Sequence, residues 1–543
     1  MQSSYDIIII GTGAGGGTIA HALAPSGKRI LILERGDFLP RERENWDEKA
    51  VFADKRYLAK ERWFDKDDQP FEPYTHYWVG GNTKVYGAAL LRLRARDFDR
   101  VEHFGGISPA WPIGYDIFEP YYSRAERLYS AHGQRGSDPC EPPASAPYPH
   151  PALGPEPRIR DLFDDFVALG YRPFPAPLGV RLDPRDAPYR FSTFDGYPDL
   201  TEVKSDSHVV AVRPVLARSN VTLMTRALVE RLVVDRSGGS VAEVLVDRDG
   251  EKLRFRADLV ILAAGAINSA ALLLRSRCDS HPTGLANSSG LVGRNYMCHQ
   301  NGCFIAVTQE PNPSAFQKHF AISDFYHSAP DSPFPLGLIQ LMGKPDSGTL
   351  AWLKGDDLPN VSVDDIKPRT IDFFLSAEDL PSPDNRVTLR DDGSIRVSYT
   401  PNNTEAYDRL QAKLARMLEQ AQQRRGHAPP HFLAKRLGVS GVSHQNGTLR
   451  FGVSARDSVL DLNCKAHDLD NLYVCDGSFF PSCGAVNPSL TIMANALRVA
   501  DHILGRLHVE AAPVNGSTHN SFDGITIGSR SQPRTTSPAS LAP

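Results

Sequence analysis

The sequence predicts an α/β protein in which a Rossmann-like dinucleotide-binding domain is interrupted by an α+β domain with an antiparallel sheet. Three observations support this. A strand of four isoleucines, residues 7–10, runs into a glycine-rich turn and a helical pattern. A second apolar strand, residues 259–266, ends in small residues and leads into another helix. Residues 301–440 carry many short strand patterns and one long helical pattern, which is typical of a separate α+β lobe.

The first glycine-rich turn has the spacing of a dinucleotide-binding site, with Gly11, Gly13 and Gly16 forming a GxGxxG. The first glycine allows the tight turn, the second admits a pyrophosphate, and the third lets helix and strand pack closely. The next strand, residues 29–33, ends in Glu34, whose carboxylate accepts hydrogen bonds from ribose hydroxyls and repels a 2′-phosphate. We therefore predict a bound dinucleotide. The alternative is a glycine-rich turn without a ligand.

Two segments with different compositions follow. Residues 40–73 are dense in charges of both signs, which favours a solvated, partly helical excursion over a dedicated binding surface. Residues 76–89 place aromatic side chains between glycines and small residues. This composition suits close approach of the backbone to a flat ring system, although a packed turn has the same pattern. The aromatic residues of the helical pattern at 118–128 are expected in the core.

The remaining elements define the two predicted lobes. Strands are expected at 221–224, 227–234 and 241–247, and then in the second lobe at 304–307, 336–341, 371–375, 386–389 and 395–399, with a long helix at 405–423. The second lobe is expected to form one wall of a small-molecule pocket. The predicted dinucleotide-binding domain comprises residues 1–90, 205–300 and 455–510, and the substrate-binding domain with its connections comprises 91–204 and 301–454. The polar tail, 511–543, is expected to be disordered.

Composition limits the partners and the compartment. With 60 basic and 64 acidic residues the net charge is −4, and no basic block suggests nucleic acid. The seven cysteines are scattered without a CxxC or metal-binding spacing, which indicates free thiols in a reducing compartment. We expect the first strand to leave no room for a signal peptide, and no apolar run approaches the roughly 20 residues of a membrane span. We expect a soluble, cytoplasmic protein with no metal site. Its oligomeric state is open.

The C-terminal region contains the candidate catalytic groups. A helix is predicted to start after Asn487, with Pro488 in its first turn and Asn487 as its N-cap. The positive end of that helix then points where Asn487 points. His444 is the candidate base, since imidazole titrates in the range needed to accept a hydroxyl proton. A single histidine among 17 is more often structural, so position alone does not identify it.

Together these motifs resemble the glucose–methanol–choline (GMC) oxidoreductase family over about residues 5–510. The similarity rests on the GxGxxG with Glu34, the Gly80-Gly81-Asn82 loop, the segments 111–122, 263–269 and 290–295, and the C-terminal His/Asn block. It implies FAD bound by an interrupted Rossmann domain, and alcohols oxidised to carbonyls by hydride transfer to flavin N5. It also implies that His444 is the catalytic base, paired with Asn487 in the place of the family's second His or Asn.

The resemblance further implies a set of cofactor contacts. The expected FAD-binding residues are Gly11, Gly13, Gly16, Glu34, Arg35, Gly81, Asn82, Thr83, Val229, Ala264, Asp476, Gly477, Pro488 and Ser489. Members that attach FAD covalently carry a histidine a few residues after the Gly-Gly pair. Since Val85 stands at that position here, we expect non-covalent FAD.

Residues 82–87, Phe316-Gln317 and the 443–445 block look closest to the pyranose and glycoside oxidase branch of the family. That likeness implies a sugar or glycoside substrate, oxidised at a secondary hydroxyl to a ketone. The polar pocket candidates are Gln317, Lys318, His319 and Asn301, all of which are equally compatible with surface positions. A non-sugar alcohol or polyol, a non-oxidative FAD-containing lyase and a non-catalytic flavoprotein are the alternatives. Whether oxygen or another acceptor reoxidises the flavin is open.

Overall fold

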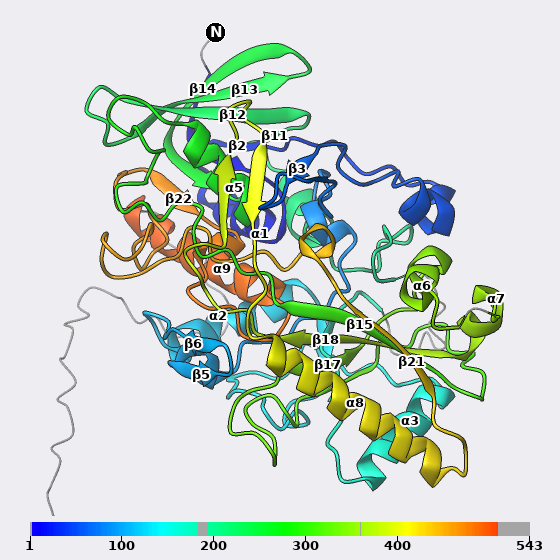
Figure 1. Ribbon diagram of the computed structural model, residues 1–543. Coiled ribbons are helices and arrows are strands. Elements are labelled where there is room, and N and C mark those ends of the chain that lie inside the picture. Colours follow the sequence, from blue (N-terminus) through cyan, green and yellow to red (C-terminus); the bar gives the residue numbers. More distant parts are fainter. Residues whose placement is uncertain (1–2, 183–193, 359, 509–543) are drawn as a thin grey trace, which may run out of the picture.

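The strand of isoleucines lies inside a seven-stranded sheet in the computed structural model, which describes residues 3–182, 194–358 and 360–508 (Figure 1). β1 (Ser3–Ile10) pairs in parallel with β2 (Ile30–Leu33) on one side and β14 (Glu251–Leu262) on the other. Ile7, Ile8 and Ile9 are fully buried. The sheet is completed by β11 (Val221–Met224), β12 (Ala227–Val234), β13 (Val241–Arg248) and β22 (Leu472–Val474). The predicted tail, 511–543, lies outside the described residues.

The long strand β14 joins the two halves of this sheet. Its first residues pair antiparallel with β13, whereas Val260–Leu262 pair in parallel with β22. After Leu262 the small residues turn the chain into α5 (Ala266–Arg275). α1 (Ala14–Leu23) packs on α9 (Ser489–Arg506), which also contacts α2 (Tyr115–Leu128). The Rossmann-like prediction is confirmed.

The second sheet has six strands, all of whose pairs are antiparallel. Its order is β21 (His431–Arg436), β15 (Gln300–Val307), β18 (Thr370–Ala377), β17 (Leu338–Leu341), β16 (Phe320–Ile322) and β9 (Phe174–Pro175). α8 (Thr404–Arg424) crosses one face of this sheet and packs with α3 (Pro157–Ala168), as Figure 1 shows. Leu410, Leu414 and Met417 of α8 share a buried core with Phe373 and Leu375. The antiparallel α+β prediction is also confirmed.

One prediction about this sheet is wrong. β19 (Arg386–Leu389) and β20 (Ile395–Ser398) do not join it but form a four-stranded sheet with β3 (Trp63–Phe64) and β4 (Pro70–Phe71). The charged 40–73 segment supplies this partner, because β3 pairs with β20 and Arg396 forms an ion pair with Asp68 at 2.6 Å. Trp63 is buried at 2% exposure, so part of the predicted solvated excursion packs into the protein.

Shorter elements connect these sheets. They are β5 (Val101–His103), β6 (Gly106–Ser108), β7 (Ala131–Gly133), β8 (His150–Pro151), β10 (Leu178–Gly179), α4 (Arg213–Val215), α6 (Ser347–Lys354), α7 (Val363–Ile366) and the single turns η1 (Ala24–Ser26), η2 (Arg43–Trp46), η3 (Lys49–Ala53), η4 (Gly81–Lys84), η5 (Ala95–Phe98), η6 (His208–Val212), η7 (Lys367–Arg369), η8 (Val439–Gly441) and η9 (Gly477–Phe479). Within the described ranges, no helix combines the length and the apolar character needed to cross a membrane. All seven cysteines lie in these ranges and are free thiols.

Candidate active site

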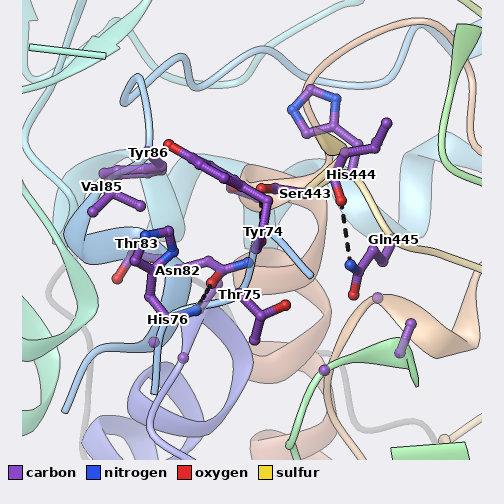
Figure 2. Close-up of a pocket in the computed structure, with 18 of the residues that line it drawn as sticks. Tyr74, Thr75, His76, Asn82, Thr83, Val85, Tyr86, Ser443, His444 and Gln445 are labelled. Atoms are coloured by element: carbon purple, nitrogen blue, oxygen red, sulfur yellow. Dashed lines mark hydrogen bonds between the residues drawn. The ribbon is translucent and has the colours of Figure 1, made fainter. Parts of the chain in front are cut away.

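A cavity of about 760 Å³ is lined by residues of both large sheets. The seven-stranded sheet contributes the turn after β1, the residues after β2, part of β12 and the turn after β14. The six-stranded sheet contributes Asn301, Gln340 and Phe374 from β15, β17 and β18. Residues 74–77, 81–83, 85–86 and 443–445 also line the cavity, and they approach it as two separate segments (Figure 2). The cavity therefore joins the predicted dinucleotide site to the predicted catalytic residues.

The three glycines of the GxGxxG have different surroundings. A Cβ on Gly11, whose φ is +101°, would overlap the carbonyl oxygen of Ala263, and one on Gly16 would overlap that of Gly11. A Cβ on Gly13, in contrast, would meet no atom within 4 Å. Gly11 and Gly16 thus serve chain packing, whereas Gly13 faces open space at the N-terminus of α1. An open backbone at a helix N-terminus fits a diphosphate.

Two buried carboxylates stand at the turns of the seven-stranded sheet. Glu34 accepts hydrogen bonds from the backbone N–H of Thr12 at 3.1 Å and that of Gly36 at 3.0 Å. Asp476 accepts one from the N–H of Gly265 at 3.0 Å and another from the hydroxyl of Ser269. Burial raises the pKa of both carboxyls. They hold the glycine-rich loop and the turn after β14 in place, and both line the cavity.

The loop after the charged segment is tied to the glycine-rich loop. The N–H of Gly80 donates to the Thr12 hydroxyl at 2.9 Å, and Gly81 adopts a φ of +55°. The side-chain oxygen of Asn82 accepts a hydrogen bond from the N–H of His76 at 2.8 Å, drawn in Figure 2. Val85 follows and lines the cavity. This loop and the glycine-rich loop therefore line the same cavity.

His444 lies in a chain of hydrogen bonds at the cavity wall. Its Nε2 is 3.3 Å from Nδ2 of Asn487, and its Nδ1 is 3.0 Å from Nδ1 of His299. The Oδ1 of Asn487 accepts a hydrogen bond from Nε2 of Gln340 at 3.1 Å. Because Gln340 occupies that oxygen, the Asn487 amide presents its N–H group to His444. Asn301 Nδ2 is 3.4 Å from His444 Nδ1.

Burial, together with His299 and Lys318, lowers the pKa of His444 well below its ordinary value. A lowered pKa keeps an imidazole neutral at physiological pH, so His444 has a lone pair available. The N-terminal residues of α9, Pro488 and Ser489, also line the cavity. A helix N-terminus carries partial positive charge and favours an anion nearby. The wall near His444 can therefore accept a proton and stabilise negative charge.

Most of the predicted site residues meet at this cavity. Every predicted cofactor residue lines it except Gly16, which packs behind the loop: Gly11, Gly13, Glu34, Arg35, Gly81, Asn82, Thr83, Val229, Ala264, Asp476, Gly477, Pro488 and Ser489. Arg35 stacks on the ring of Tyr77 at 3.6 Å and forms an ion pair with Glu61 at 3.1 Å.

Of the predicted substrate residues Gln317, Lys318 and His319, only Lys318 lines the cavity. Lys318 lines the cavity and forms an ion pair with Asp195 at 2.9 Å. Gln317 is fully buried and donates a hydrogen bond to Asp372. The ring of His319 packs against Phe316. Neither Gln317 nor His319 lines the cavity.

The expected capping role of Asn487 is wrong. Pro488 is the N-cap of α9, and it makes no side-chain capping bond. The amide of Asn487 bonds instead to His444 and Gln340, so it faces the cavity rather than the helix.

Two residues that contact the His444–Asn487 pair are not identified by the sequence analysis. His299 follows the predicted 290–295 motif by four residues, and Gln340 is a polar residue inside an otherwise apolar strand pattern. A buried polar residue within a strand is a usable signal, because it needs a partner. Within the described ranges, no group of three or more His, Cys, Asp or Glu side chains is placed to hold a metal ion.

Comparison with known proteins places the chain in a family. Models described as GMC oxidoreductase match residues 177–301 and 381–496. The chain is 34% identical to 6‴-hydroxyparomomycin C oxidase of Streptomyces lividus, over 94% of this chain and 93% of that protein. It is 31% identical to paromamine 6′-oxidase of Streptomyces fradiae, over 93% and 92%. The crystal structure of pyridoxine 4-oxidase from Mesorbium loti shares the fold, with a TM-score of 0.64 at 20% identity over 92% and 98% of the chains. The chain therefore belongs to the GMC oxidoreductase family, the FAD-dependent enzymes that oxidise CH–OH groups.

Proposed function

We propose that this enzyme oxidises a hydroxyl group of a sugar or glycoside, with His444 as the base and Asn487 as its partner. The observation that carries the proposal is the His444–Asn487 pair, 3.3 Å apart at the wall of a cavity that also contains the glycine-rich loop. FAD would be held there by the open backbone at Gly13, by Glu34, and by the loop at Gly81.

Bound FAD supplies the two-electron acceptor for the hydride that leaves the substrate carbon. The protein's own part is to remove the hydroxyl proton. Nε2 of His444 accepts that proton, and the N–H group of Asn487, oriented by Gln340, donates a hydrogen bond to the same substrate oxygen. The low pKa of His444 keeps this nitrogen unprotonated before substrate arrives. The positive end of α9 stabilises negative charge that develops near Pro488.

The proposed substrate class rests on the relatives' names as well as on the sequence. Two relatives are named as oxidases of hydroxyparomomycin and paromamine, and the second name gives position 6′. Carbon 6′ of a hexopyranose lies outside the ring and carries a primary hydroxyl, which gives an aldehyde. The resemblance to the pyranose and glycoside oxidase branch implies instead a secondary hydroxyl, which gives a ketone. The carbonyl product therefore identifies the oxidised carbon.

An anaerobic stopped-flow screen tests this proposal. The holoenzyme is mixed with monosaccharides, amino glycosides, polyols and simple alcohols, and bleaching of the flavin absorbance is followed. We expect sugars or glycosides to reduce the flavin fastest, with the carbonyl position identified by NMR of the product. Faster reduction by polyols or simple alcohols would contradict the sugar assignment. A flavin that stays oxidised with every alcohol would favour a lyase and contradict oxidation altogether.

We also propose that FAD is bound without a covalent link, since Val85 has no nucleophilic side chain. Precipitation with acid should leave the yellow chromophore in the supernatant, because unfolding releases a non-covalent cofactor. A yellow pellet would show that another side chain attaches the flavin. Mass spectrometry of the intact denatured chain provides the independent check.

The pH dependence of flavin reduction tests the state of His444. An unperturbed histidine is half protonated at about pH 6.5. Because the folded pKa of His444 is lower, its neutral form persists below that pH and is lost only as pH falls through the lowered value. At saturating substrate the reduction rate should therefore change less than about twofold between pH 8 and 6.5. A rate that halves near pH 6.5 would contradict a lowered pKa.

We propose the same domain boundaries that the sequence suggests. Residues 1–90, 205–300 and 455–510 form the FAD-binding domain, and residues 91–204 and 301–454 form the substrate-binding domain and its connections.

A cytoplasmic location is proposed because all seven cysteines are free thiols.

A further inference from the structure

His299 contacts the catalytic base from behind. His299 is 2% exposed, and its ring stands perpendicular to that of His444, with ring centroids 5.1 Å apart and an interplanar angle of 86°. Nδ1 of His299 is 3.0 Å from Nδ1 of His444, and its Nε2 is 3.2 Å from the carbonyl oxygen of Cys483. The ring thus bridges a backbone carbonyl and the nitrogen of His444 opposite the one facing Asn487.

These contacts define where the protons are. The carbonyl of Cys483 can only accept a hydrogen bond, so Nε2 of His299 carries the hydrogen. Burial lowers the pKa of His299, against the opposing influence of Glu378, so its ring is neutral and its Nδ1 has the lone pair. Nδ1 of His444 must then be the donor to His299, which leaves the lone pair of His444 on Nε2.

Asn301 does not reverse this assignment. Its Nδ2 lies 3.4 Å from Nδ1 of His444, farther than the ring of His299, and it donates to the carbonyl of Cys298. The opposite tautomer of His444 would need hydrogens on both nitrogens of His299, which is the charged form that burial disfavours. Among the described groups, Glu378 is an acidic neighbour of His299, Lys318 is a cationic neighbour of His444, and Asp379 bonds to Cys298 and Gln300 on either side of His299.

The backbone is built to hold His299 in this position. His299 has a φ of +64°, in the left-handed region that few residues other than glycine adopt, and such strain concentrates at functional positions. Asp379 fixes both neighbours by accepting from the N–H of Cys298 at 2.9 Å and from the side chain of Gln300 at 3.0 Å.

A second tie connects the two histidines through the backbone. Met297 and Asn446 exchange two backbone hydrogen bonds, of 3.0 Å and 2.8 Å. Each of these residues lies two positions from its histidine, so the segments carrying His299 and His444 are in fixed register. The distance between the two rings is therefore set by the fold and not by two independent loops.

We infer that His299 is a positioning residue that fixes His444 in the tautomer with a bare Nε2, the nitrogen that takes the substrate proton in the proposed mechanism. This inference rests on the proposed role of His444. The neutral partner distinguishes it from a carboxylate, which would raise the pKa of the base. Here the base keeps both its orientation and its low pKa.

Three variants of His299 test this inference. His299→Leu removes the acceptor, His299→Asn retains an amide oxygen near the position of Nδ1, and His299→Asp supplies a charged acceptor. We expect flavin reduction to fall about 10–100-fold in His299→Leu, the same range as for removing a group that orients a metal-binding histidine. His299→Asn should recover most of that loss. His299→Asp should raise the pKa of His444, so that the reduction rate begins to fall at a higher pH than in the wild type.

A double variant distinguishes positioning from structural damage. If His299 acts through His444, His299→Leu/His444→Ala should reduce flavin no more slowly than His444→Ala alone. Equal losses in His299→Leu and His299→Asn, or full additivity in the double variant, would overturn the inference. Nitrogen-15 NMR of histidine-labelled protein gives a readout besides activity: His444 should carry its proton on Nδ1 in the wild type and lose that preference in His299→Leu.

The failure of the two proposals can be told apart. If His444→Ala reduces flavin as fast as the wild type, the assignment of the base fails, and the inference about His299 fails with it. If His444→Ala is slow and His299→Leu reduces flavin at the wild-type rate with FAD bound, only the positioning role fails. Should His299→Leu not fold, as judged by its FAD content, His299→Asn and His299→Asp still test the tautomer through the pH profile.

Discussion

Replacing His444 by alanine should lower the rate of flavin reduction by roughly 10²–10⁴-fold, the range that a positioned general base contributes. The physical reason is that Nε2 of His444 is the neutral acceptor at the cavity wall, held between Asn487 and His299. FAD should remain bound, because the glycine-rich loop and Glu34 do not contact this ring. The measurement is the anaerobic reduction rate at saturating substrate, with flavin content determined in the same samples.

His427→Ala is the matched control for that variant. His427 lies beyond α8, is partly exposed, and is absent from the cavity wall. It should reduce flavin at the wild-type rate. An unchanged rate in His444→Ala would remove this residue from the mechanism, while an equal loss in both variants would indicate a general effect on folding.

Gly13→Ala should weaken FAD binding while leaving the chain folded. A Cβ at Gly13 would meet no protein atom within 4 Å, so the methyl group adds no clash inside the protein. It would instead project into the space proposed for the diphosphate. Crowding of about 1–3 kcal/mol corresponds to a loss of about 5–150-fold in affinity. The dissociation constant is measured by titrating the apoprotein with FAD and following flavin fluorescence.

Two other glycines provide the comparison. Gly16→Ala places its Cβ against the carbonyl of Gly11, so it should destabilise the fold itself and lower the melting temperature of the apoprotein. Gly154→Ala, at an exposed glycine where a Cβ is 3.8 Å from the nearest atom, should change neither property. Equal FAD affinity in Gly13→Ala and Gly154→Ala would mean that the diphosphate lies elsewhere.

The Rossmann-like part was predictable because its signals are local. The four isoleucines, the GxGxxG and the acidic residue after the second strand each indicate local structure without reference to distant residues. In the structure, Gly13 and Glu34 line one cavity. The strand at 259–266 was likewise evident from its apolar run, although it ends at Leu262 and leaves the small residues to form the turn.

The sheet membership of β19 and β20 was not predictable from the same kind of pattern. Both strands were found in the sequence, but strand partners depend on which segments the fold brings together. Here the partner came from Trp63–Phe64, which pairs with β20 from about 330 residues earlier in the chain, inside a segment whose charges suggested solvent. A periodic pattern specifies a strand but not its neighbour.

The sequence identified the main residues of the site but not the hydrogen bonds between them. His444 and Asn487 were selected by resemblance, and they lie 3.3 Å apart. The capping role given to Asn487 was wrong because Gln340, on a strand of the other sheet, holds its amide. His299 was missed for the same reason: its contact with His444 spans 145 positions, and only the folded chain brings the two rings together.

A crystal structure of the holoenzyme would test the central claim most directly, namely that one cavity brings FAD and the imidazole of His444 together. We expect the adenine beside Val229, the diphosphate at Gly13, and the isoalloxazine ring facing the His444–Asn487 pair with room for one substrate carbon between them. A flavin ring on the far side of the cavity from His444, or FAD bound outside the cavity, would contradict this account.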